Sequence, residues 1–290
     1  MNFVKKLMCA AAMALSTTGA AIASPVLNNW VFNPTGTGFN GGQVINEYLD
    51  INGNAFIQLN RTGSTSFEFR EHAVFNVPQA DSNGRYFPIT YRGGNITATF
   101  EATGSGTFGG AFNFTGGTMR MYHNPTNGQY AGTAGYYGAN LGNMIAEFNV
   151  MGGGGMVDQN GIPTNNGQVS VFAEAAAGML DPGYFFNSAG KDLSTDSILS
   201  FAFTNANTLG SPTSRLVSEV ACQFSGFTGA GCNGRTYRNR PGEYFFIGSN
   251  GQFKLAEAPS DVPEPGSIAL FGIALAAAGA VARKRKAVSK

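Results

Sequence analysis

The sequence predicts an all-β protein whose main domain is an antiparallel β-sandwich of the jelly-roll type. From Trp30 onward, apolar residues largely alternate with polar or small ones, a period of two that directs one face of each strand inward. The chain also contains 41 Gly and 24 Phe, which fits a fold with an aromatic core and glycine-rich corners. Short alternating strands joined by tight turns favour two packed antiparallel sheets.

The first 23 residues have the pattern of a signal peptide. Lys5 and Lys6 precede an apolar stretch at 7–15, and Ala21 and Ala23 place small residues at the two positions that a signal peptidase recognises. We expect cleavage after Ala23 and export of the remaining chain.

A series of segments carries the alternation of apolar and polar residues along the chain. They are residues 44–50, 55–60, 66–77, 96–101, 118–123, 144–151, 169–175, 198–204 and 244–248. Turn-forming residues separate them and supply the positive φ angles that tight turns require. These are Asn52-Gly53, Asn83-Gly84, Gly93-Gly94, Gly116-Gly117, Asn127-Gly128, Asn160-Gly161, Asn166-Gly167 and Asp181-Pro182-Gly183. The segments are therefore expected to pair as hairpins.

Four consecutive glycines, Gly152–Gly155, interrupt this pattern halfway along the chain. They are open to two interpretations, a long loop inside one domain or a hinge between two domains. Four glycines reach only a short distance and similar strands flank them, which favours the loop.

Residues 214–223 are the best candidate for a helix. Leu216, Val217, Val220 and Ala221 fall on one face of a helix with 3.6 residues per turn. We expect one short helix packed on the sandwich, with Cys222 at its end.

Cys222 and Cys232 flank a Gly-rich loop and are expected to form one disulfide in the oxidising environment of an exported protein. A metal site is the alternative interpretation. The two histidines, His72 and His123, lie far from this loop in sequence and at no ligand spacing. Neither a metal nor a cofactor is therefore expected.

The main domain is expected to span residues 24–255 and to continue into an extended linker at 256–262. This linker combines small, polar and proline residues without an apolar period.

The C-terminal segment, residues 263–290, together with Val262 at the end of the linker, combines three features in a fixed order. The tetrapeptide Val262-Pro263-Glu264-Pro265 leads into an uncharged apolar run at 266–282. As a helix this run rises about 25 Å, just enough to cross a bilayer. The basic tail at 283–290 then holds the C-terminus on the cytoplasmic side. Its cluster consists of Arg283, Lys284, Arg285 and Lys286.

This tail resembles the PEP-CTERM sorting signal of Gram-negative, exopolysaccharide-producing bacteria. The resemblance implies that an integral-membrane transpeptidase of the exosortase type cuts near Pro263-Glu264-Pro265. It also implies that the protein passes from an inner-membrane intermediate to the cell surface or extracellular matrix. An ordinary membrane anchor after a proline-rich hinge is the alternative.

Two blocks of the main domain look like the flocculation-associated members of the PEP-CTERM group. They are W-V-F-N-P-T-G-T-G at 30–38 and R-L-V-S-E-V-A-C at 215–222. This second resemblance implies a role in aggregating cells within exopolysaccharide, and it assigns no binding residue.

The sequence contains no G-x-S-x-G elbow, H-E-x-x-H pair, P-loop or C-x-x-C motif. A glycoside hydrolase needs only two carboxylates across a cleft, and the strand residues Glu68, Glu71 and Glu101 are the candidates. Solvated charge on a strand face is the simpler explanation of each. We therefore expect a protein that is not an enzyme.

Residues 50–54, D-I-N-G-N, place oxygen ligands at alternate positions, as the start of a calcium loop does. The glycine is fourth in this segment, whereas an EF-hand has it at the sixth position. The prediction is a hairpin turn.

Residues 24–262 contain 11 Lys and Arg and 16 Asp and Glu, a formal charge of −5. A mildly acidic domain offers no basic surface for nucleic acid. Its many Asn, Thr and Gly residues suit weak, multivalent contact with hydrated polymers. The predicted function is exopolysaccharide-associated adhesion, flocculation or biofilm formation. A carbohydrate-binding module or a secreted polysaccharide-active enzyme is the alternative.

Overall fold

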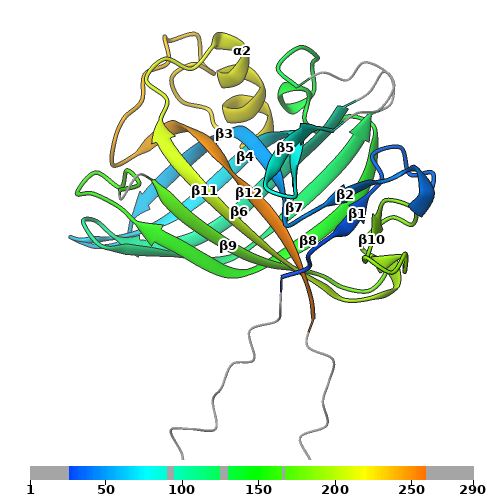
Figure 1. Ribbon diagram of the computed structural model, residues 1–290. Coiled ribbons are helices and arrows are strands. Elements are labelled where there is room, and N and C mark those ends of the chain that lie inside the picture. The colour runs from blue at the N-terminus through cyan, green and yellow to red at the C-terminus, as the bar shows by residue number, and fades with distance from the viewer. Residues whose placement is uncertain (1–25, 90–94, 125–129, 165–166, 259–290) are drawn as a thin grey trace, which may run out of the picture. The chain divides into compact units, whose positions relative to one another are not determined.

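Eight antiparallel strands close into a barrel in the computed structural model, which describes residues 26–89, 95–124, 130–164 and 167–258 (Figure 1). The barrel strands are β3 (Tyr48–Arg61), β4 (Ser66–Ser82), β6 (Asn95–Thr107), β7 (Ala111–Asn124), β8 (Asn143–Met156), β9 (Gln168–Ala175), β11 (Ile198–Thr208) and β12 (Tyr244–Glu257). Each strand pairs with the next barrel strand along the chain, and β12 returns to pair with β3.

This closure corrects the predicted sandwich, although the all-β prediction is confirmed. One sheet curls until its first and last strands meet, through a register that runs from Tyr244 opposite Gln58 to Lys254 opposite Tyr48. Register shifts at β-bulges interrupt the β3–β4, β6–β7, β7–β8 and β8–β9 ladders. Bulges bend strands and increase their twist, which favours closure of a sheet.

Smaller elements lie outside the barrel ring. The strand β5 (Arg85–Pro88) pairs only with β4 among the described strands. A second sheet has the order β10 (Phe185–Phe186), β1 (Trp30–Phe32), β2 (Gln43–Ile45). Short 3₁₀ turns are η1 (Phe39–Gly41), η2 (Tyr136–Gly138) and η3 (Leu193–Thr195).

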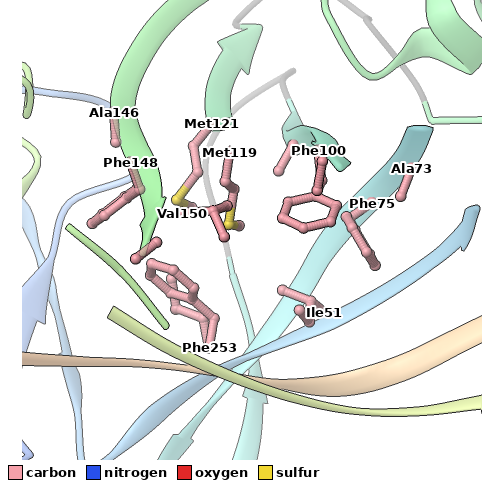
Figure 2. Packing of buried hydrophobic residues seen from close by; sticks show 14 of the residues in the cluster. Ile51, Ala73, Phe75, Phe100, Met119, Met121, Ala146, Phe148, Val150 and Phe253 are labelled. Atoms are coloured by element: carbon pink, nitrogen blue, oxygen red, sulfur yellow. The ribbon is translucent and has the colours of Figure 1, made fainter. Parts of the chain in front are cut away.

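Apolar side chains fill the interior of the barrel. On β4 the odd-numbered residues Phe67, Phe69, Ala73 and Phe75 are all buried. Figure 2 shows Ala73 and Phe75 of this strand with side chains from β3, β6, β7, β8 and β12. An eight-stranded barrel has an interior just wide enough for side chains to fill, so this interior is the protein core.

Two predicted turns lie inside strands. Asn52-Gly53 belongs to β3 and Gly116-Gly117 to β7, so both turn predictions, and with them the hairpin predicted at 50–54, were wrong. A Cβ atom on Gly53 would stand 2.2 Å from the carbonyl oxygen of Val74 on the paired strand. A glycine is therefore needed here for the close approach of another strand.

The glycines Gly152–Gly155 also lie inside a strand, because β8 continues through them to Met156. The loop predicted at this position, and the alternative interdomain hinge, were both wrong. Gly153 has a φ of 118°, and a Cβ atom on it would stand 2.2 Å from the carbonyl oxygen of Ser170. This conformation and this contact exclude other residue types.

Other sequence predictions hold at the level of elements. Asn83-Gly84 forms the turn between β4 and β5, with positive φ at both residues. The predicted strand at 44–50 divides into β2 and the beginning of β3. The strand β12 includes Ala256 and Glu257, the first two residues of the expected linker. Gly93-Gly94, Asn127-Gly128 and Asn166 lie outside the described residues.

The predicted helix at 214–223 is present as one α-helical turn, α2 (Ser214–Leu216), followed by a π-helix, η4 (Val217–Phe224). Thr213 caps it, because its Oγ1 accepts a hydrogen bond of 3.1 Å from the Leu216 backbone N–H. The predicted apolar face is buried against the outer surface of β3, β4 and β12. Its members are Leu216, Val217, Val220 and Ala221.

Candidate functional site

The terminal sites predicted from the sequence lie outside the described residues. These are the signal cleavage residues Ala21 and Ala23, the sorting residues Val262, Pro263, Glu264 and Pro265, and the basic residues Arg283, Lys284, Arg285 and Lys286. Within residues 26–258, excluding the three undescribed gaps, no helix has both the length and the apolar character needed to cross a membrane.

Cys222 and Cys232 form a disulfide in the structure, with their Cα atoms 5.5 Å apart. The bond ties the end of η4 to the loop that leads toward β12.

The two histidines lie in different parts of the fold. His72 faces outward on β4, and its ring centroid is 4.9 Å from that of Phe224 at the end of η4. His123 is buried, and its Nδ1 lies 2.7 Å from the Tyr184 hydroxyl oxygen. Burial lowers the pKa of both rings. Each histidine ring packs against an aromatic side chain, His72 against Phe224 and His123 against Tyr184.

The candidate carboxylates Glu71 and Glu101 face opposite sides of the barrel wall. Glu71 is registered with Ala102, whose side chain is in the core, whereas Glu101 is registered with the outward residue His72. Glu101 accepts a hydrogen bond of 2.7 Å from Arg120 on the outer surface. These two carboxylates therefore do not flank a common cleft.

Glu68 shares the outer face with Glu101 but lies far from it along the strands. Glu68 is four residues from His72, the partner of Glu101, which corresponds to about 13 Å of extended strand. Glycosidase carboxylates are about 5 to 10 Å apart. The structure therefore does not bring any two of the three candidates into that arrangement.

Glu71 points into the barrel beside a cavity of about 40 Å³. Phe100, Phe114 and Met119 are among the apolar residues that line this cavity. Burial raises the pKa of Glu71 from 4.5 to about 7. The cavity has room for a few water molecules and none for a sugar ring, so a sugar cannot enter it beside Glu71.

The block at 215–222 anchors the helix to the barrel. Besides its four buried apolar residues, it contains Glu219, which accepts hydrogen bonds of 2.9 Å from Arg215 Nε and 2.7 Å from the Tyr137 backbone N–H. Arg215 also donates to the carbonyl oxygen of Ala131. The block at 215–222 therefore stabilises the packing of the helix on the barrel, and it is not an exposed binding motif.

The block at 30–38 also has a structural role. Trp30 and Phe32 are completely buried and pack against Phe185. Asn33 organises the loop that follows, since its side chain donates to the carbonyl oxygen of Gly38 and accepts from the backbone N–H of Thr35. The two blocks that resemble the flocculation-associated members of the PEP-CTERM group therefore have structural roles in this fold.

The outer face of the barrel carries a row of amide side chains that the sequence analysis did not single out. The row crosses five neighbouring strands in direct register. It consists of Gln168, Asn205, Asn250, Asn52 and Asn76. Its sequence signal is a pair of amides at alternate positions of a strand, which period two places on one face. Such pairs are Asn52/Asn54, Asn205/Asn207 and Asn250/Gln252.

Neighbouring amides in the row interact, and some of their hydrogen-bonding capacity remains open. Asn250 Nδ2 donates to Asn52 Oδ1, and Asn52 Nδ2 donates to Asp50 Oδ2 at 3.2 Å. Gln168, Asn205 and Asn250 are exposed, so their remaining amide groups face the surroundings. Asn76 Oδ1 is enclosed and takes no part in this open capacity. An amide offers two donors and an acceptor, so this row can bind groups that both donate and accept.

Comparison with known proteins identifies the C-terminal segment. A family model described as the PEP-CTERM protein-sorting motif matches residues 261–286. The chain matches no curated protein and no solved structure. The motif confirms the predicted sorting segment and implies an exported protein that passes through the membrane to the cell surface and is processed by an exosortase-type enzyme.

Proposed function

We propose that this chain, which carries the sorting motif of exported proteins, is an adhesion protein of the cell surface or extracellular matrix of a Gram-negative bacterium. It contacts exopolysaccharide and promotes flocculation or biofilm formation. A signal peptidase removes residues 1–23 before the exosortase-type enzyme acts on the C-terminal segment.

The amide row is the observation that carries this proposal. Its members come from five strands of a rigid barrel, so their hydrogen-bonding groups are held in place without a ligand. Single amide–hydroxyl contacts are weak, but many copies of the protein along one polymer combine them through effective concentration. Such multivalent contact is what a matrix adhesion protein requires.

The proposal includes a non-catalytic role. It is supported by the separation of Glu68, Glu71 and Glu101 on two faces of the barrel wall. A polysaccharide-active enzyme needs two carboxylates on one cleft, with a spacing that suits a sugar ring between them.

The proposal is tested by deleting the gene in its exopolysaccharide-forming host and measuring cell aggregation. We expect the deletion to abolish aggregation, and we expect restoration by wild type and by Glu68→Gln, Glu71→Gln and Glu101→Gln. Normal aggregation after deletion would exclude the adhesion role. Depolymerisation of the host polysaccharide that one of the three variants abolishes would establish an enzyme instead.

A further inference from the structure

We infer that the outer barrel face holds a defined binding groove for a single chain of neutral polysaccharide. The inference rests on the proposed function and names its binding site. Two adjoining depressions of about 460 and 380 Å³ share Asn205 and Asn250 of the amide row. These volumes lie in the range of ligand sites. We call the two depressions together the amide groove.

A second row of residues forms the floor of the amide groove next to the amide row. Asn207, Gly248 and Asn54 lie in register on β11, β12 and β3. Asn54 Nδ2 donates a hydrogen bond of 3.0 Å to the Tyr130 hydroxyl, which in turn donates to the carbonyl oxygen of Val74. Tyr130 therefore fixes one end of the floor.

An exposed aromatic ring lies at the other side of the amide row. Phe203 is 45% exposed and lines the groove beside Ser170 and Gln252, with which it is in register. An exposed phenyl ring offers a flat apolar surface, and sugar rings carry apolar C–H faces that pack on such surfaces. Neighbouring amides at the same site hold the hydroxyl groups of the ring.

The charges at the groove favour an uncharged ligand. None of the described residues that line it is a lysine or an arginine. The carboxylate nearest to the row is Asp50, which accepts hydrogen bonds from Asn52 and from Gln79. Asp50 is itself buried and lines neither depression. A polyanion would find no cation among the described lining residues to offset its charge, so a neutral polymer is the better fit.

The length of the amide row favours a polymer over a single sugar. The row crosses four inter-strand spacings of about 4.8 Å each, which gives about 19 Å. This distance is longer than one sugar ring, so consecutive rings of one chain can each meet a different amide.

Gly248 offers a direct test of the groove. A Cβ atom on Gly248 would meet no atom of the described structure within 4 Å, because it would project into the groove. Gly248→Val places its Cβ atom without a clash and fills the floor with its branched side chain, and a β-branched residue is well suited to a strand. Gly152→Val is the control, because Gly152 on β8 is equally open to a Cβ atom but lines neither depression.

The experiment measures binding of the protein, purified from the host surface, to the neutral and acidic fractions of the host's own exopolysaccharide. We expect wild type and Gly152→Val to bind the neutral fraction, and Gly248→Val to lose affinity by about tenfold or more. Circular dichroism and thermal unfolding check that both variants are folded. Equal binding by wild type and Gly248→Val, binding to the acidic fraction alone, or binding to neither fraction would overturn the groove.

Cell aggregation separates failure of the groove from failure of the proposed function. If deletion abolishes aggregation and Gly248→Val restores it fully, the adhesion role stands and the groove is rejected. If deletion leaves aggregation unchanged, the proposed function itself is rejected.

Discussion

Glu71 shows how one residue in the barrel core makes stability depend on pH. In the folded protein burial raises its pKa to about 7, whereas the unfolded chain releases the proton near 4.5. Between these values the folded state binds more protons than the unfolded state. The free energy of unfolding therefore falls as pH rises through this window and is level above it.

We predict that wild type loses up to about 3 kcal/mol of stability between pH 4.5 and pH 8 through Glu71. Glu71→Gln is neutral throughout, so this decrease should be absent from the variant. Urea unfolding of both proteins at a series of pH values measures the effect. The control is Glu68→Gln, which alters an exposed carboxylate on the same strand. Equal pH profiles of wild type and Glu71→Gln would refute the prediction.

Much of the residue-scale arrangement was accessible from the sequence. Glu71 was interpreted from the sequence as solvated charge on a strand face, and this was wrong, because Glu71 points into the barrel. Period two puts it on the same face as Phe69 and Phe75, so the alternation alone indicates its inward direction. Asn52 was predicted in a turn and Asn250 lay beyond the predicted strand at 244–248, so neither amide was placed on an outer face. Their direct register could not be predicted, because it depends on which strands pair and at what offset.

At the scale of elements, the disulfide and the helix act as one unit on the outer face. Cys222 lies in η4, and Cys232 lies in the loop after it. Val220 of the helix and Phe246 of β12 belong to one buried cluster, so packing fixes the helix to the barrel. The disulfide then ties the loop after the helix back to the helix.

We predict that replacing Cys222 and Cys232 together by Ala lowers the free energy of unfolding by about 2 to 3 kcal/mol, because the unfolded chain regains the entropy of an open loop. Urea unfolding of the oxidised wild type and the double variant tests this difference. Wild type with its disulfide reduced should match the variant. An unchanged midpoint in both would contradict a stabilising role for the bond.

The elements also show where local sequence is ambiguous. The helix was predictable because its apolar residues recur at helical spacing, and the face that they form is the face buried in the structure. Gly53 and Gly153 were misplaced because a glycine needed for close strand approach has the same sequence appearance as one in a turn. Only the positions of the neighbouring strands distinguish the two cases.

At the scale of the whole molecule, the difference between a sandwich and a barrel depends on one long-range pairing. All other neighbouring barrel strands follow one another along the chain, whereas β12 pairs with β3 across most of the domain. The alternation of inward and outward residues is the same with or without this pairing. The sequence therefore predicts strands and an apolar interior, but it does not show that the sheet closes.

Closure of the barrel also leaves the polar outer face as the surface that an exported protein presents to its surroundings. Asn205 and Asn207 are exposed there, beside the exposed ring of Phe203. In the proposed function the protein therefore acts from outside the cell through this face.

The most direct test is to add the protein, purified from the surface of the wild-type host, to cells of the deletion strain and to measure their sedimentation. We expect added protein to restore aggregation in proportion to its concentration, because the polymer that it contacts is already outside the cells. If purified folded protein leaves the deletion strain dispersed at every concentration, the protein does not promote adhesion from outside the cell.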